Sequence, residues 1–552
     1  MAELSFLDSP HLQPVKYKSV IDVFYEKASE FPEKEICIQR FADGSRRSIT
    51  YSDLKIKAER VARFLIGKSI QVSDNIGIIG PNSIEWIVGE LAILMTGAVC
   101  LHLSKPHGKF QKTLEQLQLS ECKAVLLDLE SDTTFVEDIE GFVSDNPSNE
   151  GHGLDKPIFV LLRKKDKSML PDVETIGGLD QYQIDKQLPG IVPDTPAIVF
   201  MTSGSTGLPK MVEVTHLALV NTESAYMLTR GVGGRGETYF NDRPFSWIGG
   251  TIIYCLLQGD TRVFRDGRIT VKGGDVMDLW NIIIEEKCTN GLLLPFTIYD
   301  LLQNKQKIKK TGYRMMSIVT GGQIIRHKET EILGEICEQM YMLYGSTEVG
   351  IVTFSPLDNN MTIGCLGNLF PGVQIKVVGE DLNTIVRGEM GVLLIKSPWM
   401  LKGYRNATEA QRKSIANGWM NTGDVGIIKS DGQLIIKGKI NNVIKRGTLK
   451  VVSGDVEDCI ASFPGVRDVV VIAVPDPRMY EEVCACVVFD KNTAVNMDAV
   501  RAHCTESLGD NIIGNAPTFY LEFDTLPQLG TGKPDKVNIQ RDAVGRLNIK
   551  TK

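Results

Sequence analysis

The residues best suited to chemistry lie in a glycine- and hydroxyl-rich stretch that reads TSGSTGLPK and follows the apolar run at residues 197–200. Glycines let a loop bend and expose its backbone N–H groups, while hydroxyls and a lysine add further donors to an anion. The usual phosphate-loop pattern is absent, because Pro209 precedes Lys210 and Met211 follows it. The stretch therefore indicates either a polyphosphate loop of different design or a flexible surface loop. Its candidate ligands are Thr202, Ser203, Gly204, Ser205, Thr206, Gly207 and Lys210.

A second candidate, YGSTE at residues 344–348, follows an apolar run fit for a strand. Glycine, small hydroxyls and a carboxylate at a strand end could cap a nucleotide, with Glu348 holding Mg²⁺ on a phosphate oxygen. The alternative is a strand-to-helix turn in which Ser346 or Thr347 serves as the N-cap.

Three further stretches carry polar groups that could act on a nucleotide. WMNTGD ends in Asp424, whose carboxylate could accept hydrogen bonds from ribose hydroxyls or belong to a polar turn. The stretch after Gly438 contains Lys439 and Lys445, which could equally form a solvated basic face. LPQLGTGK ends in Lys533 on a glycine loop, which taken alone indicates an exposed surface lysine.

Composition limits the protein classes that need considering. The chain has 552 residues, 43% of them apolar, and a formal net charge of −7, which is typical of a globular protein and argues against nucleic acid as a partner. Its eleven cysteines include no C-x-x-C pair, so they predict buried thiols in a reducing compartment. Cys484 and Cys486 alternate as core residues of a strand do.

We expect a cytoplasmic location, since we find no signal peptide, no transmembrane stretch and no C-terminal Ser-Lys-Leu.

The hydrophobic pattern predicts the elements that position these motifs. A strand at residues 75–79, a helix at 84–95 and a strand at 98–103 follow one another, and further strands are expected at 124–127 and 158–162. This rhythm is typical of a parallel α/β sheet. Short alternating runs between glycines at residues 364–438 predict a β-rich subdomain, and an α+β unit follows residue 442. Polar loops are expected at residues 144–156 and 231–236. A further helix is expected within residues 49–65, where Leu54, Ala58, Val61, Ala62 and Leu65 fall on one apolar face.

The order and spacing of these motifs are more specific than any single one. Taken with ITYSDL and GPNSIEW nearer the N-terminus, they make nearly the full chain resemble the adenylate-forming superfamily. That superfamily comprises acyl- and aryl-CoA synthetases, peptide-synthetase adenylation domains and beetle luciferases, and the chain is most similar to a medium-chain or aryl acyl-CoA synthetase. The resemblance implies two layered α/β subdomains plus the β-rich subdomain (about 364–437) in an N-terminal domain at 1–437. A hinge at 438–442 and a mobile α+β domain at 443–552 would follow.

The resemblance also implies a two-step reaction with ATP, Mg²⁺ and coenzyme A. A carboxylate attacks the α-phosphate and releases pyrophosphate; the small domain then rotates, and a thiol displaces AMP. Lys533 would bridge the carboxylate and the nucleotide, Thr347 would donate to the α-phosphate, and Glu348 would hold the metal. The implied nucleotide contacts are Ser203, Gly204, Ser205, Thr206 and Lys210 for pyrophosphate, Tyr344, Gly321, Gly322 and Gln323 for adenine, and Asp424 and Lys439 for ribose. Gly345 and Ser346 are implied as further nucleotide contacts.

The implied acid site is PFSWIGG at residues 244–250, together with Phe296 and Tyr299. Trp247 would separate the acyl tunnel from the thiol entrance, although a core tryptophan is the alternative; Gly249 and Gly250 would form a floor of small residues. No carboxylate lies in this segment to hold an ammonium group, so a fatty or aryl acid is expected rather than an amino acid.

Three positions depart from the family pattern. Lys439 replaces an arginine that could form a bidentate contact with ribose, and Asn441 replaces a charged hinge residue. After Lys445, Gly447 stands one place early in the loop that lines the thiol tunnel in relatives. Two alternatives therefore stay open: an enzyme that delivers its adenylate to a carrier protein or to oxygen, and a nucleotide or acyl sensor without catalysis. Small molecules are the expected partners; the sequence does not specify the acid or the oligomeric state.

Overall fold

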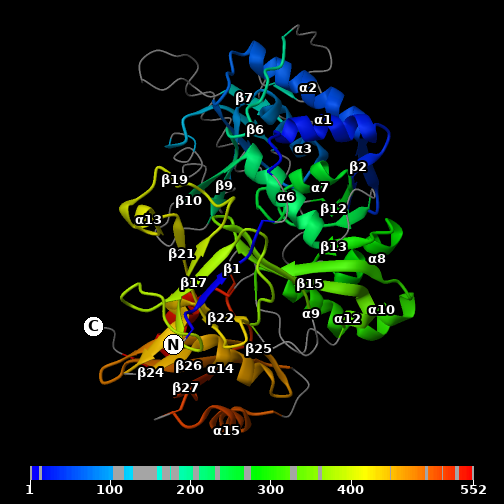
Figure 1. The fold of residues 1–552 in the computed structure, drawn as a ribbon. Coiled ribbons are helices and arrows are strands. Elements are labelled where there is room, and N and C mark those ends of the chain that lie inside the picture. The colour runs from blue at the N-terminus through cyan, green and yellow to red at the C-terminus, as the bar shows by residue number, and fades with distance from the viewer. Residues whose placement is uncertain are drawn as a thin grey trace.

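The computed structural model describes the chain from residue 3 to residue 549 with several gaps. The described ranges are 3–11, 15–103, 117, 119–128, 158–163, 174–175, 186–202, 210–230, 237–266, 275–323, 332–357, 364–447, 449–490, 495–511, 514–528 and 534–549. Four sheets organise them (Figure 1).

The first two sheets each have eight strands, most of them parallel neighbours. Sheet A has the order β19 (Tyr404–Arg405), β10 (Lys210–Thr215), β9 (Pro196–Thr202), β5 (Val99–His102), β4 (Asn75–Ile79), β6 (Cys122–Leu127), β7 (Ile158–Leu161) and β8 (Glu174–Thr175). Sheet B has the order β16 (Gly350–Pro356), β15 (Cys337–Ser346), β14 (Met315–Gly321), β13 (Asn290–Leu292), β11 (Thr238–Phe240), β12 (Thr261–Arg265), β2 (Glu35–Arg40) and β3 (Arg46–Thr50).

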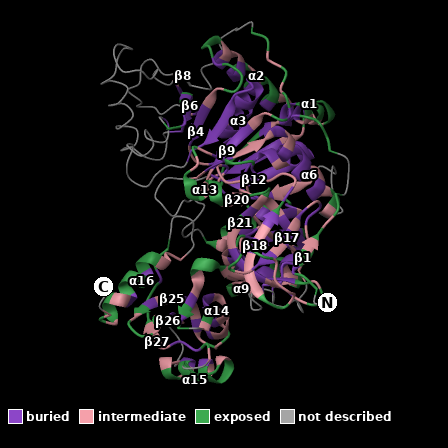
Figure 2. Cartoon of the chain, turned by 60° about the vertical axis from the view of Figure 1, so that its left-hand side comes forward, coloured by how far each residue is buried: buried purple, intermediate pink, exposed green. Residues whose placement is uncertain are grey.

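Helices join the two large sheets into one layered body. The largest apolar core contains residues of both sheets and of five helices that lie between them: α1 (Val20–Glu30), α2 (Tyr51–Gly67), α3 (Ile84–Met95), α6 (His216–Arg230) and α7 (Ile253–Gln258). Almost every residue of α3 is buried, and α3, β4 and β9 form the purple interior of Figure 2. A separate core under sheet B involves α8 (Val276–Glu285), α9 (Pro295–Gln303), α10 (Lys305–Thr311) and α12 (Leu333–Ile336).

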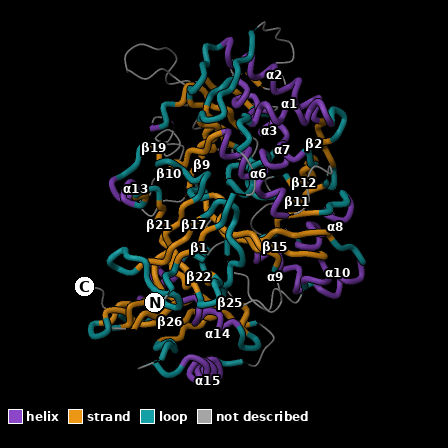
Figure 3. The backbone as a smooth tube through the Cα atoms, in the orientation of Figure 1, coloured by secondary structure: helices purple, strands orange, loops and turns teal. Residues whose placement is uncertain are grey.

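The other two sheets are smaller and mainly antiparallel. Sheet C has the order β1 (Phe6–Asp8), β17 (Gln374–Val378), β18 (Met390–Lys396), β21 (Trp419–Ile428) and β20 (Ile415–Ala416), with β22 (Leu434–Lys439) also paired to β21; α13 (Glu409–Lys413) precedes β20. Sheet D has the order β24 (Leu449–Val452), β23 (Val443–Arg446), β26 (Tyr480–Phe489) and β25 (Val466–Asp476), with β27 (Phe519–Glu522) also paired to β26. Helices α14 (Ser453–Ala461) and α15 (Met497–Leu508) accompany sheet D in Figure 3, and α16 (Lys536–Arg546) is seen beside it in Figure 2.

This arrangement confirms the predicted fold class. Sheets A and B are the two layered α/β subdomains, sheet C is the β-rich subdomain, and sheet D with its helices is the small α+β unit. The helix predicted at 84–95 has both ends as expected, because Ser83 caps it by accepting the Trp86 N–H at 3.1 Å. The predicted apolar face of α2 is buried. Cys484 and Cys486 are fully buried in β26, also as predicted. The loops expected at 144–156 and 231–236 lie outside the described residues.

Two local alternatives considered from the sequence were wrong. YGSTE does not lead into a helix: its first residues belong to β15, which turns back into antiparallel β16. The WMNTGD stretch is part of strand β21 instead of forming a turn. The pairing of β21 with β18 shifts register there, and Gly423 has a φ of +70° at this point. In both cases pairing with a neighbouring strand overrides a local turn signal.

Two ion pairs and one short element connect sheets C and D. The 3-10 helix Ile440–Asn442 follows β22 directly and leads into β23. On either side of it, Lys437 pairs with Asp455 at 2.8 Å, and Lys450 pairs with Glu380 at 2.9 Å. The domain boundaries remain predictions.

We expect the burial of His216, the first residue of α6, to make the stability of the large body depend on pH. Its side chain is 1% exposed, and Nδ1 has no hydrogen-bond partner in the described part of the chain. Burial lowers the pKa of His216 to about 4, against an ordinary value of 6.5. The unfolded chain therefore binds this proton more readily than the folded one, and stability is lost as pH falls from about 6.5 towards 4.

We predict that His216→Gln removes part of this acid sensitivity. Between pH 7.5 and 5, the unfolding free energy of the wild type should fall by about 2 kcal/mol more than that of the variant. Urea unfolding at both pH values measures the difference. Parallel pH dependence in the two proteins would contradict the assignment.

Candidate active site

Three predicted nucleotide contacts meet at the carboxylate of Asp424. The Tyr344 hydroxyl donates to Asp424 Oδ2 at 2.8 Å, and Lys439 Nζ lies 3.0 Å from Oδ1. Tyr344 comes from β15, whereas Asp424 and Lys439 are paired across β21 and β22. Asp424 is buried, and burial together with its charge raises the pKa of Tyr344 well above the ordinary value, so the hydroxyl remains a donor. Since each carboxylate oxygen has two acceptor positions, both can still accept a ribose hydroxyl.

The glycines beside this cluster occupy positions where a side chain would not fit. Gly321 ends β14 and pairs with Leu343, next to Tyr344; a Cβ there would lie 2.2 Å from the Leu343 carbonyl oxygen. A Cβ on Gly345 would lie 2.2 Å from the Gly350 carbonyl oxygen. Gly322 follows with φ of +77°, a conformation that favours glycine, and leads to Gln323. The GGQ turn and the YGSTE strand therefore lie side by side at the edge of sheet B.

A second cluster joins Glu348 to Lys210 through a residue that sequence reasoning missed. The hydroxyl of Tyr404 donates to Glu348 Oε1 at 3.2 Å, and Lys210 Nζ lies 5.5 Å from the centroid of the Tyr404 ring. Pairing between β10 and β19 places Tyr404 opposite Val212, two residues from Lys210. Burial and the Glu348 charge raise the pKa of Tyr404, so this hydroxyl also remains a donor. Nothing in the local sequence connects residue 404 with residues 210 and 348; only strand pairing reveals it.

The surroundings of Glu348 suit a magnesium ion shared with phosphates. One of its oxygens is held by Tyr404, which leaves the other for a metal, and the residue is only half-buried. No group of three or more metal-ligating side chains occurs in the described ranges. Magnesium commonly takes one or two carboxylates plus phosphate oxygens and water, so a single carboxylate fits. Thr347 and Ser346 lie beside Glu348 at the turn between β15 and β16.

Two predicted loops are described only at their bases. Thr202 and Lys210 are paired across β9 and β10, while Ser203, Gly204, Ser205, Thr206 and Gly207 lie outside the described residues. Lys533 also lies outside them. The flanks of its loop are paired through Gln528 and Pro534. Beyond them, Lys536 Nζ lies 3.0 Å from Glu457 Oε1 of α14.

The predicted acid-site residues come from two segments that follow strands of sheet B. Trp247, Gly249 and Gly250 lie in the connection between β11 and α7, and Phe296 and Tyr299 lie on α9. The guanidinium of Arg243, in the same connection, lies 5.6 Å from the centroid of the Phe296 ring, so the two elements are in contact.

The predicted hinge and thiol residues follow the Asp424 cluster directly. Lys439 ends β22, and Asn441 lies in the 3-10 helix that begins at the next residue. Lys445 is exposed on β23, and its backbone N–H donates to Glu481 Oε2 at 2.7 Å. Gly447 has φ of +56°, and its N–H donates to the Met479 carbonyl oxygen at 2.8 Å.

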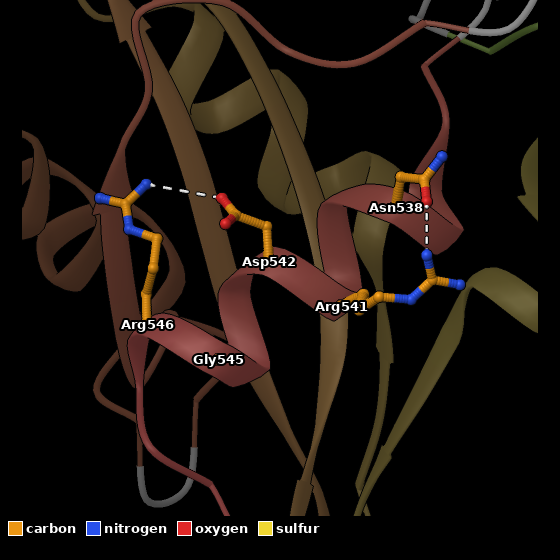
Figure 4. Close-up of a pocket in the computed structure, with 5 residues that line it drawn as sticks. All are labelled: Asn538, Arg541, Asp542, Gly545 and Arg546. Atoms are coloured by element: carbon orange, nitrogen blue, oxygen red, sulfur yellow. Dashed lines mark hydrogen bonds and ion pairs between the residues drawn. The ribbon is translucent and has the colours of Figure 1, made fainter.

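A surface hollow on α16 contains none of these residues. Figure 4 shows its lining, in which Arg541 donates to Asn538 and Arg546 pairs with Asp542 along the same helix. Its polar groups therefore have partners one turn away, as on a solvated helix face.

Comparisons with known proteins identify the family of this chain. Residues 24–405 match the AMP-binding enzyme family, and residues 455–533 match the AMP-binding enzyme C-terminal domain. The chain belongs to the AMP-binding enzyme family, which confirms the resemblance to the adenylate-forming superfamily.

Individual relatives are distant but span nearly the whole chain. A mitochondrial medium-chain acyl-CoA ligase of Danio rerio is 24% identical and covers 99% of this chain and 91% of its own. A long-chain-fatty-acid–CoA ligase of Escherichia coli is 23% identical, covering 98% and 97%. The crystal structure of the anthranilate CoA ligase AuaEII with anthranoyl-AMP superposes with a TM-score of 0.81 at 18% identity, covering 97% and 99%.

We predict that Tyr404→Phe weakens binding of Mg·ATP about tenfold, because outer-shell partners of a metal ligand typically contribute 10- to 100-fold. The variant keeps the ring beside Lys210 but frees Glu348 to turn away. Tyr404→Leu, which also removes the ring, should bind more weakly still. Titration calorimetry with Mg·ATP measures both.

Tyr313→Phe is the matched control, since its hydroxyl donates to the Cys288 carbonyl oxygen at 3.0 Å and touches no predicted site residue. Equal affinity for Mg·ATP in Tyr404→Phe and the wild type would refute the role of this hydroxyl.

Proposed function

We propose that this protein is an ATP-dependent acid–thiol ligase that activates a fatty or aryl acid and transfers it to coenzyme A. The observation that carries the proposal is the meeting of separate motifs: Tyr344 with Asp424 and Lys439, and Glu348 with Lys210 through Tyr404. These are the positions at which the family resemblance implies nucleotide and metal contacts. The names of the acyl-CoA ligase relatives support the thiol acceptor and the acid class.

In the first half-reaction, a carboxylate oxygen of the acid forms a bond to the α-phosphorus, and the bond from that phosphorus to pyrophosphate breaks. Positioning and charge stabilisation supply most of the catalysis in such displacements. Asp424 and Lys439 would hold the ribose, Thr347 would donate to the α-phosphate, and Lys210 would neutralise the leaving pyrophosphate. Magnesium, held by Glu348, would offset charge on the phosphates.

Lys533 would stabilise the attacking carboxylate and the α-phosphate together. A preorganised donor of this kind is worth roughly 10²–10³ in rate. In the second half-reaction, the thiol sulfur forms a bond to the acyl carbon, the acyl–phosphate bond breaks, and the thiol proton leaves to solvent. Because the thiol must approach the same carbonyl, Lys533 would first withdraw by rotation about residues 438–442.

No helix in the described part of the chain is long and apolar enough to cross a membrane. We propose a cytoplasmic enzyme whose partners are small molecules: the acid, ATP and coenzyme A.

Incubation with ATP, Mg²⁺, coenzyme A and a panel of straight-chain and aryl acids should yield AMP, pyrophosphate and an acyl-CoA ester. Liquid chromatography with mass spectrometry identifies all three products. Acid-dependent exchange of pyrophosphate into ATP without any ester would favour a carrier protein or oxygen as acceptor. Tight ATP binding with no exchange would favour a sensor, and release of ADP would refute the proposal.

Lys533→Ala should separate the two half-reactions. We predict that acid-dependent pyrophosphate exchange falls by roughly 10²–10³, whereas thioester formation from a supplied acyl-adenylate changes by less than about threefold, because Lys533 has left the site by then. Lys413→Ala, at an exposed ion pair on α13, is the control and should leave both rates unchanged. An equal loss of both half-reactions in Lys533→Ala would contradict the rotation.

A further inference from the structure

Residues 241–251, between β11 and α7, form a tight loop around Trp247, which we call the Trp247 loop. The Trp247 N–H donates to the Pro244 carbonyl oxygen at 3.0 Å, and the N–H groups of Gly250 and Thr251 both donate to the Trp247 carbonyl oxygen, at 2.9 and 2.8 Å. A Cβ on Gly250 would lie 1.9 Å from the Pro244 carbonyl oxygen. The backbone therefore closes on itself so tightly that only glycine fits at residue 250.

A buried arginine from the neighbouring strand ties the two ends of this loop together. Arg262 lies on β12, opposite Tyr239 of β11, and is 1% exposed. Its Nε donates to the Asn241 carbonyl oxygen at 2.5 Å. Its Nη2 donates to the Gly250 carbonyl oxygen at 2.9 Å and its Nη1 to that of Thr251 at 3.4 Å. One planar guanidinium thus bridges the first residue of the loop and its last two.

The charge of Arg262 makes this contact unusual. Among the described residues no carboxylate hydrogen-bonds to it, and burial lowers the pKa of Arg262. Arg265, three residues along the same strand, has the Asp242 carboxylate at 2.5 Å instead. Burying a cation costs free energy unless strong hydrogen bonds offset the loss of water. Here the offset comes from backbone carbonyl groups, so the buried charge serves to hold backbone.

Two asparagines fix the remaining part of the loop. Asn241 Nδ2 donates to the Gly249 carbonyl oxygen at 3.0 Å. Asn82, from the GPNSIEW motif, accepts the Phe245 N–H at 2.8 Å and donates to the Arg243 carbonyl oxygen at 2.8 Å. The loop is therefore held at both ends by Arg262 and in the middle by Asn241 and Asn82.

We propose that Arg262 is a positioning residue that fixes the Trp247 loop as a rigid wall of the acid site and thereby sets which carboxylic acids the enzyme accepts. The proposal rests on the proposed function, because Trp247 and Phe296 are acid-site residues only if the protein activates an acid. The Arg243 guanidinium also contacts the Phe296 ring, so the loop lies against α9, which carries the other acid-site residues.

Arg262→Lys is the informative change, since lysine keeps the charge but cannot reach three carbonyl oxygens with one planar group. A rigid apolar pocket distinguishes acids that differ by one methylene by ~10–200-fold. In Arg262→Lys we expect the ratios of kcat/KM between successive straight-chain acids to fall to about fivefold or less, while KM for ATP stays within about twofold. Arg40→Lys, at a buried arginine held by Glu285 and Glu286 instead, is the matched control and should keep the wild-type acid profile.

A second measurement does not need turnover. In protein labelled with 5-fluorotryptophan, the ¹⁹F resonance of Trp247 is assigned with Trp247→Phe. Arg262→Lys should broaden or split this resonance and leave that of Trp419, on β21 of sheet C, unchanged. If Arg262→Lys fails to fold, the milder Arg262→Gln, which can still reach one carbonyl oxygen, takes its place.

An unchanged Trp247 resonance in the folded variant would refute the positioning role. A perturbed resonance with an unchanged acid profile would refute the role in selectivity. If the wild type turns over no acid, the proposed function fails and the selectivity role fails with it, whereas the fluorine result still decides whether Arg262 positions the loop.

Discussion

The two-residue strand β19 holds the candidate site together. Its backbone pairs with β10 of sheet A, and the hydroxyl of Tyr404 reaches Glu348 at the edge of sheet B. Arg405 adds contacts to Glu213 and Asn75, both at 2.7 Å, and the nearby Leu401 N–H donates to the Glu348 carbonyl oxygen. The base of the TSGSTGLPK loop belongs to sheet A and the YGSTE hairpin to sheet B, so β19 connects the two. A short pairing between segments about 190 residues apart therefore fixes the distance between Lys210, a candidate phosphate ligand, and Glu348, the candidate metal ligand.

Buried charge in this protein follows a consistent pattern. Asp424 is shared by a tyrosine and a lysine, and Asp242 by two arginines. Isolated charges are expensive inside proteins, so each carboxylate is accompanied by donors from other elements. The same groups that offset the cost also bring distant segments into contact. Arg262 extends the pattern to backbone carbonyl groups.

The sequence predicted the layered α/β architecture and several elements closely because those signals are local. Hydrophobic periodicity and the Ser83 cap determine α3, for example. Long-range pairing produced the errors. WMNTGD has the composition of a turn, yet pairing with β18 and β22 makes it a strand. Tyr404 was missed for the same reason. Its place between Lys210 and Glu348 depends on strand pairing with Val212, which lies far from it in the sequence. Arg262 was missed too. An arginine in an apolar strand suggests an exposed side chain, and the sequence does not show that the Trp247 loop covers it.

Lys439 stands at the end of β22, one residue before the 3-10 helix at the predicted hinge. It contacts both Asp424 and the Thr422 carbonyl oxygen, so it connects the candidate ribose site to the segment about which the small domain would turn. In the proposed cycle, occupancy of that site and the angle of the hinge are therefore thermodynamically linked. Such linkage is reciprocal: a nucleotide that favours one orientation is itself held more tightly in that orientation, by the same factor. Lys439 of this chain stands where the family pattern has an arginine. This difference would then change the rate of domain rotation as well as the affinity for the ribose.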